Sequence, residues 1–113
     1  MTKIYHNPRC RKSRETLQLL ESKGEKIEII LYLEDTPSEK ELSSIIKQLG
    51  IAPIELVRKN EAVWKEQFKG KELSDSQIIS IMIEHPKLIE RPIVLKNGKA
   101  VLGRPPENVL NIL

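Results

Sequence analysis

Hydrophobic and polar positions alternate at the start of the chain and then change to a helical period. The run TKIYH alternates and ends at Asn-Pro, which predicts a short strand over residues 2–5 followed by a turn. From Arg11 onward, leucines recur on one side of a predicted helix that ends at Gly24. The run KIEIILYL, at residues 26–33, then predicts a buried strand. We expect the two strands of this strand–helix–strand unit to be parallel.

The middle of the chain, about residues 38–85, has the hydrophobic period of helices. The segment DTPSEKELSSIIKQLG predicts a helix that is capped by Thr36 or Ser38 and ends at Gly50. APIELVRKN predicts irregular or short-helical structure, and EAVWKEQF predicts a short helix. A further helix in SDSQIISIMIEHP begins at the capping residue Ser74 and ends near the following proline.

The last third of the chain returns to strands. RPIVL and KAVLG flank the turn KNG, and Asn-Gly is a strong hairpin signal. RPPENVLNIL predicts a short helix with prolines in its first turn. This order of elements is that of a thioredoxin-like fold. We therefore predict one α/β domain over residues 1–113, with three α/β/α layers, a small mixed sheet and a helical insertion over about residues 38–85, before the final hairpin.

Composition narrows the class of protein. A length of 113 residues suits one domain with its own core. The net charge of +3 comes from acids and bases mixed along the chain, and aromatics are only 4%, which argues against a nucleic-acid binder. The N-terminus lacks the apolar core of a signal peptide, and no segment approaches the roughly 18 apolar residues of a membrane span. We expect a cytoplasmic monomer without a membrane or nucleic-acid partner and without a metal site.

The single cysteine, Cys10, lies in the positively charged stretch YHNPRCRKSRE. One cysteine excludes an internal disulfide and favours a reducing compartment. Cys10 directly precedes a predicted helix, whose first N–H groups lack helical partners and whose dipole adds positive charge. Such a setting, with Arg9, Arg11, Lys12 and Arg14 nearby, raises the thiolate fraction of a cysteine and can hold an oxyanion. We interpret Cys10 as a nucleophile rather than a structural cysteine.

The neighbours of Cys10 limit its chemistry. A tyrosine-phosphatase loop requires arginine six positions after the cysteine, where this chain has Thr16. A dithiol redox motif requires cysteine where this chain has Ser13, whose hydroxyl can instead donate a hydrogen bond to the sulfur. His6 either tunes the thiol, orients the loop or only satisfies backbone groups in the turn. The residues therefore indicate a single thiol that accepts an oxyanion or a mixed disulfide and is reset by an external thiol.

Four segments together resemble the glutaredoxin- and glutathione-dependent arsenate reductases: YHNPRCRKSRETLQLL, LVRKN, HPKLIERPIV and GRPPENVLNIL. They occur in the family's order and cover essentially the whole chain. The resemblance implies that Cys10 attacks arsenate to form a covalent thiol–arsenate adduct. It further implies that glutathione attacks this adduct, that glutaredoxin supplies the second thiol, and that arsenite is released. Both reductants act as external thiols, and no bound cofactor is implied.

The resemblance also assigns residues around the anion. Arg58, Arg91 and Arg104 match the family's three oxyanion-binding arginines. Planar, permanently charged guanidinium groups suit such an anion better than lysine does. Pro92 matches the cis-proline that packs beside the cysteine of thioredoxin-like folds. Three further residues are expected to support the site: His6, Ser13 and Arg14.

Arg11 and Lys12 depart from the family's pattern, which often has small residues after the cysteine. They add charge and would either crowd the anion or alter the surface that meets the partner.

Other functions stay open. Spx-like regulators, which bind RNA polymerase without catalysis, share the fold but typically carry Cys-x-x-Cys in a longer chain. Monothiol glutaredoxin-like thiol transfer is compatible with Ser13, and the fold can also be retained without activity.

Overall fold

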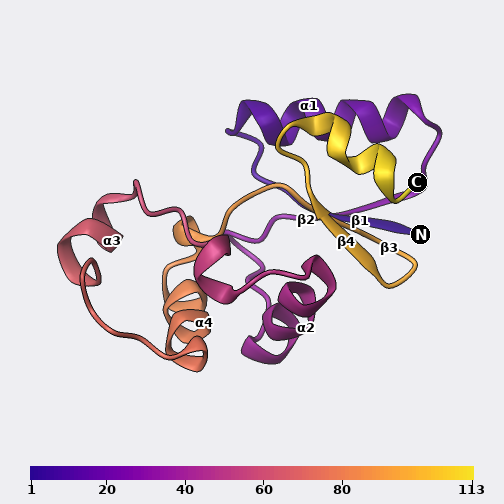
Figure 1. The fold of residues 1–113 in the computed structure, drawn as a ribbon. Helices are drawn as coiled ribbons and strands as arrows, with labels where there is room; N and C mark the ends of the chain where they lie inside the picture. Colours follow the sequence, from indigo (N-terminus) through magenta and orange to yellow (C-terminus); the bar gives the residue numbers. More distant parts are fainter. The chain divides into compact units, whose positions relative to one another are not determined.

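A mixed β-sheet joins the two ends of the chain in the computed structural model, which describes all 113 residues (Figure 1). Its strands, in the spatial order β2-β1-β3-β4, are β1 (Thr2–Tyr5), β2 (Ile27–Ile30), β3 (Ile93–Lys96) and β4 (Lys99–Leu102). β1 pairs with β2 in parallel, as predicted, and with β3 antiparallel. The sheet belongs to a compact unit, here called the sheet unit, that comprises Met1–Asp35 and Arg91–Leu113.

Two helices of the sheet unit lie together beside the sheet (Figure 1). They are α1 (Arg11–Ser22) and the C-terminal 3₁₀ helix η3 (Pro106–Asn111). Four fully buried side chains, one each from β1, α1, β3 and η3, form a core cluster between the helices and the sheet: Ile4, Leu20, Val94 and Val109. Burial of each such aliphatic side chain contributes about 1.5–3 kcal/mol. This core fixes α1 on the sheet and so determines where the first turn of α1 lies.

The second strand is shorter and more exposed than its sequence suggests. A buried strand was expected over residues 26–33, but β2 ends at Ile30 and Leu33 lies in a turn. β2 is an edge strand, and Ile29, Leu31 and Leu33 are 49%, 37% and 42% exposed. The prediction of a buried strand was wrong because an apolar run does not reveal whether a strand is central or at an edge.

The hairpin between β3 and β4 is confirmed. Its two turn residues, Asn97 and Gly98, have φ values of 52° and 75°. Positive φ at both positions is the requirement of a type I′ turn, which explains the Asn-Gly pair. The hairpin places Gly103 and Arg104 immediately after β4, on the segment that leads to η3.

The remaining residues, Thr36–Glu90, form a second compact unit, here called the helical unit. Its elements are α2 (Glu39–Leu49), η1 (Pro53–Leu56), α3 (Ala62–Gln67), α4 (Asp75–Glu84) and η2 (Pro86–Leu88). Ser38 and Ser74 cap α2 and α4 by accepting hydrogen bonds from backbone N–H groups. The helices expected here are confirmed. None of the helices in the chain has both the length and the apolar character that a transmembrane helix needs.

Candidate active site

Cys10 is the N-cap residue of α1, as the sequence predicts. Its backbone is extended, with φ −95° and ψ 123°, and its side chain makes no capping hydrogen bond. The first helical hydrogen bond runs from the Arg14 N–H to the Cys10 carbonyl, at 3.0 Å. The N–H groups of α1 before Arg14 therefore have no helical acceptor, and together with the helix dipole they favour an anion at this end. The side chain of Cys10 is partly exposed, so a solute can reach the thiol.

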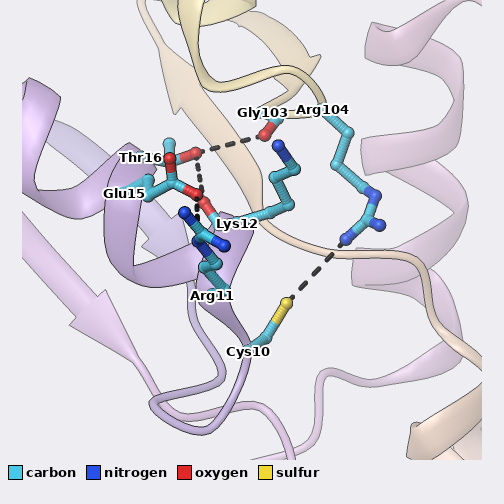
Figure 2. A network of polar contacts seen from close by, with 7 residues as sticks. All are labelled: Cys10, Arg11, Lys12, Glu15, Thr16, Gly103 and Arg104. Atoms are coloured by element: carbon cyan, nitrogen blue, oxygen red, sulfur yellow. Dashed lines mark hydrogen bonds and ion pairs between the residues drawn. The ribbon is translucent and has the colours of Figure 1, made fainter.

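Arg104 brings a permanent positive charge to this thiol. Its Nη1 lies 3.8 Å from the Cys10 sulfur, to which it donates, and 3.3 Å from the carbonyl oxygen of Arg91 (Figure 2). The Arg91 carbonyl thus helps to orient the guanidinium toward the sulfur. A guanidinium keeps its charge at any physiological pH. The contact joins two residues 94 positions apart, and it therefore depends on the tertiary fold.

The segment that carries Arg91 adds two further features. The Arg91–Pro92 peptide bond is cis, as the resemblance implies, and the Arg104–Pro105 bond is also cis, which was not predicted. The Nε of Arg91 is buried and has no hydrogen-bond partner. An unsatisfied buried donor is costly, at about 1–3 kcal/mol or more for a charged group. Arg91 thus contributes its carbonyl to the thiol's surroundings and keeps an unused donor.

The loop before Cys10 is held by His6 and Ser13. The His6 Nδ1 and the Ser13 Oγ are 2.6 Å apart, and both side chains are buried. The Asn7 N–H also donates to the Ser13 Oγ, at 3.0 Å. Which of the two groups donates depends on the tautomer of the His6 ring, and the expected hydrogen bond from Ser13 to the sulfur is not found. Of the roles considered for His6, the structure supports orientation of the loop.

Burial and the charge of Arg14 disfavour protonation of the His6 ring. Burial, followed by the positive charge of the Arg14 guanidinium, lowers the pKa of His6 below its ordinary value of 6.5. The same guanidinium donates to the Pro8 carbonyl at 3.0 Å, and so ties the loop to α1. A neutral imidazole can accept the Ser13 hydroxyl, whereas an imidazolium cannot.

This pair predicts a stability that depends on pH. The pKa of His6 is lower in the folded protein than in the unfolded chain. As the pH falls through 6.5, the unfolded chain therefore takes up the proton first, and stability is lost until the folded-state pKa is passed. We expect His6→Gln to be less stable than wild type near neutral pH, by about 1–2 kcal/mol, with a gap that narrows on acidification. Thermal unfolding at a series of pH values measures this gap, and a gap independent of pH would contradict the prediction.

Gly103 is a site residue that sequence analysis missed. Its N–H donates to the Pro92 carbonyl at 2.9 Å, and its carbonyl accepts the Thr16 hydroxyl at 3.2 Å (Figure 2 shows the second bond). A Cβ at this position would lie 2.5 Å from the Thr16 Oγ1 and 2.9 Å from the Pro92 Cγ. Glycine therefore lets α1, the cis-proline and the segment of Arg104 approach one another. The only local signal is a glycine at the end of a strand, which often marks such an approach.

Nearly the whole chain is similar in sequence to known proteins. A sequence model of the ArsC family matches residues 5–112. The chain belongs to the ArsC family. It is 50% identical to the uncharacterized protein YfgD of Escherichia coli (strain K12), over 98% of this chain and 95% of that protein. It is 48% identical to the arsenate reductase of Haemophilus influenzae, over 97% of each.

A solved structure supports the same assignment. The arsenate reductase from Vibrio cholerae superposes with a TM-score of 0.95 and is 52% identical, over 99% of this chain and 97% of that one. The predicted thioredoxin-like α/β fold with a small mixed sheet is therefore confirmed for this ArsC-family protein.

Arg11 and Lys12 do not contact the thiol of this ArsC-family protein. The Arg11 side chain is 84% exposed, and its Nε pairs with the Glu15 Oε1 at 3.4 Å, one helical turn along α1. Figure 2 shows the Lys12 side chain directed toward the Gly103–Arg104 segment rather than toward the sulfur. The two residues that depart from the family's pattern therefore alter the surface next to Cys10 and leave the thiol uncrowded.

Arg58 lies in the helical unit, at the start of the segment after η1. Its Nε is 3.3 Å from the Glu90 Oε1, and both side chains are about three-quarters buried. Its backbone N–H donates to the Leu88 carbonyl at 2.7 Å. The ion pair orients the guanidinium within the helical unit, and the backbone bond holds the segment that carries Arg58. Its assignment as an oxyanion ligand stays a prediction from the resemblance.

Proposed function

We propose that this ArsC-family protein reduces arsenate to arsenite through a covalent adduct on Cys10, with glutathione and glutaredoxin as external thiols. The observation that carries the proposal is the Arg104 guanidinium, 3.8 Å from the Cys10 sulfur, at a helix end with unpaired N–H groups. A nucleophile and an anion-binding site thus share one location. Similarity over the whole chain to proteins named arsenate reductases supports the choice of arsenate.

Three groups of the sheet unit suit a tetrahedral oxyanion. The first N–H groups of α1 can donate hydrogen bonds to an anion, and Arg104 supplies a planar charged donor beside the sulfur. The Nε of Arg91 is buried without a partner, so a bound oxygen atom would satisfy it. Arg58 is proposed as the third arginine on the resemblance alone.

The first step is a condensation. The Cys10 sulfur attacks arsenic, an S–As bond forms, and one arsenate oxygen leaves as water after protonation. Arsenic stays at oxidation state V, so no electrons are transferred. Arg104 and the α1 N–H groups stabilise the negative charge on the remaining oxygens.

The second step carries the reduction. The glutathione thiolate attacks the Cys10 sulfur, an S–S bond forms, and the S–As bond breaks with its electron pair on arsenic, which leaves as arsenite. Two thiols have then been oxidised to one mixed disulfide, and arsenic has gained two electrons. A glutaredoxin thiolate next attacks the glutathione sulfur of this disulfide and regenerates the Cys10 thiol.

A coupled assay tests the proposal. Purified protein is mixed with arsenate, glutathione, glutaredoxin, glutathione reductase and NADPH, and NADPH oxidation and arsenite are both measured. We expect one NADPH consumed per arsenite and no reaction when glutathione is omitted. Absence of arsenite at millimolar arsenate would reject the proposal. Thiol transfer to a mixed disulfide without arsenate turnover would then favour the glutaredoxin-like alternative, and co-purification of RNA polymerase would favour the regulator.

Arg104→Lys tests the role of the guanidinium. Lysine keeps the positive charge but loses the planar fork that binds an oxyanion through two hydrogen bonds. We expect kcat/KM for arsenate to fall by about 10- to 100-fold, since each factor of ten corresponds to about 1.4 kcal/mol of binding. Arg11→Lys is the matched control, because Arg11 is also exposed on this surface but pairs with Glu15. An equal fall in both variants would contradict a specific role of the Arg104 guanidinium, and an unchanged kcat/KM in Arg104→Lys would show that the positive charge alone is enough.

A further inference from the structure

A pocket beside the cysteine loop takes no part in the chemistry described above. It has a volume of about 230 Å³ and lies wholly within the sheet unit. One wall is the loop that precedes Cys10, and the other is the segment after β2. The lining residues used below are Pro8, Arg9, Leu31, Leu33 and Glu34.

The lining combines an apolar surface with one charge of each sign. Leu31 and Leu33 belong to the exposed apolar side chains that follow the edge strand, at 37% and 42% exposure. Arg9 and Glu34 line the same pocket. Neither takes part in a salt bridge, since the ion pairs of the chain lie elsewhere. Both charged side chains are exposed, so a solute that enters this open pocket can meet an apolar wall and both charges.

The two unpaired charges complement a zwitterion. A carboxylate suits the Arg9 guanidinium, and an ammonium group suits the Glu34 carboxylate. An amino-acid head group carries both on one carbon atom. The pocket volume is below the roughly 300–1,000 Å³ of drug-sized ligand sites, so it suits the end of a small peptide rather than a whole one.

We propose that this pocket binds the γ-glutamyl end of glutathione, whose free amino and carboxyl groups form such a head group. The inference rests on the proposed function, in which glutathione is the first reductant. Arg9 directly precedes Cys10, and consecutive Cα atoms are about 3.8 Å apart. The thiol is on the central residue of glutathione, within about two residue lengths, or roughly 7 Å, of the head group. This reach suits a pocket whose lining residue Arg9 adjoins Cys10. Binding here makes the attack of the second step effectively intramolecular.

Binding of S-methylglutathione tests this inference without any turnover. The analogue keeps both head-group charges, but its blocked sulfur cannot react. We expect Arg9→Gln and Glu34→Gln each to raise the dissociation constant of the analogue about tenfold, because each variant loses a charged hydrogen bond. Calorimetric titration measures this constant. Arg11→Gln and Asp35→Asn are the matched controls. They remove the same charges from neighbouring positions that do not line the pocket, and they should bind as wild type does.

The outcomes separate this inference from the proposed function. Wild-type protein that does not bind the analogue at millimolar concentration, or pocket variants that bind like their controls, would overturn the inference even if arsenate is reduced. Selective weakening in the two pocket variants would support it even if the coupled assay shows no arsenite. NMR shifts on titration add a second measure: the inference requires them at Arg9, Leu33 and Glu34.

Discussion

Cys10→Ser should abolish arsenate-dependent NADPH oxidation and at the same time make the protein slightly more stable. The hydroxyl group is a far weaker nucleophile than a thiol, and no other cysteine is present to replace it. Removal of a catalytic nucleophile lowers the turnover rate by several orders of magnitude, so we expect turnover to fall by at least about a thousandfold.

The gain in stability follows from the place of Cys10 in α1. Cys10 is the N-cap residue, its backbone is extended as an N-cap requires, and its side chain accepts no hydrogen bond from the helix. Serine is among the preferred N-cap residues, and a good cap contributes about 0.5–2 kcal/mol. The natural residue is therefore a poor cap, which is the expected cost of a reactive thiol at this position.

Cys10→Ala separates the two effects. Alanine has neither the thiol nor a capping oxygen, so it should lose activity without the gain in Tm seen for serine. Thermal unfolding and the coupled assay on the three proteins give both quantities. Turnover by Cys10→Ser within tenfold of wild type would refute the covalent mechanism. A Tm of Cys10→Ser below that of Cys10→Ala would refute the capping argument.

Local signals explain which elements the sequence could predict. The N-cap position of Cys10, the serine caps of α2 and α4, and the Asn-Gly turn each depend on a few adjacent residues, and each is confirmed. The exposure of β2 depends instead on which strands neighbour it. Its isoleucines and leucines have the same local pattern in a central strand as at an edge, and only the sheet order distinguishes them.

The candidate active site also combines features that adjacent residues predict with features that depend on the tertiary fold. The contact of Arg104 with Cys10 could not be derived from spacing, because it depends on how η3, β4 and α1 pack. The sequence predicts a hydrogen bond from the Ser13 hydroxyl to the sulfur, whereas in the structure this hydroxyl pairs with the buried His6 ring. A hydroxyl one turn into a helix has several acceptors within reach, and burial of one of them decides the outcome. Gly103 was missed for a related reason: its neighbours, Thr16 and Pro92, are distant in the chain.

Gly103→Ala is expected to destabilise the sheet unit by about 3 kcal/mol, which corresponds to a fall in Tm of roughly 10–15 °C. The added methyl group would meet the Thr16 Oγ1 at 2.5 Å, the Thr16 Cγ2 at 2.8 Å and the Pro92 Cγ at 2.9 Å. The surroundings must shift, and the movement would disturb the hydrogen bond from the Thr16 hydroxyl to the Gly103 carbonyl. Because Arg104 is the next residue, activity should fall together with stability.

Thr16→Ala provides the decisive comparison. Alone, it should cost about 1 kcal/mol, because the buried hydroxyl donates to the carbonyls of Lys12 and Gly103. Together with Gly103→Ala, it removes both Thr16 atoms that the new methyl group would meet and leaves only the Pro92 contact. The double variant should then be at least about 1 kcal/mol more stable than the sum of the single effects predicts. Denaturant unfolding of the four proteins measures this coupling free energy. Strict additivity would mean that the methyl group is accommodated elsewhere and that close approach of α1 does not explain the glycine.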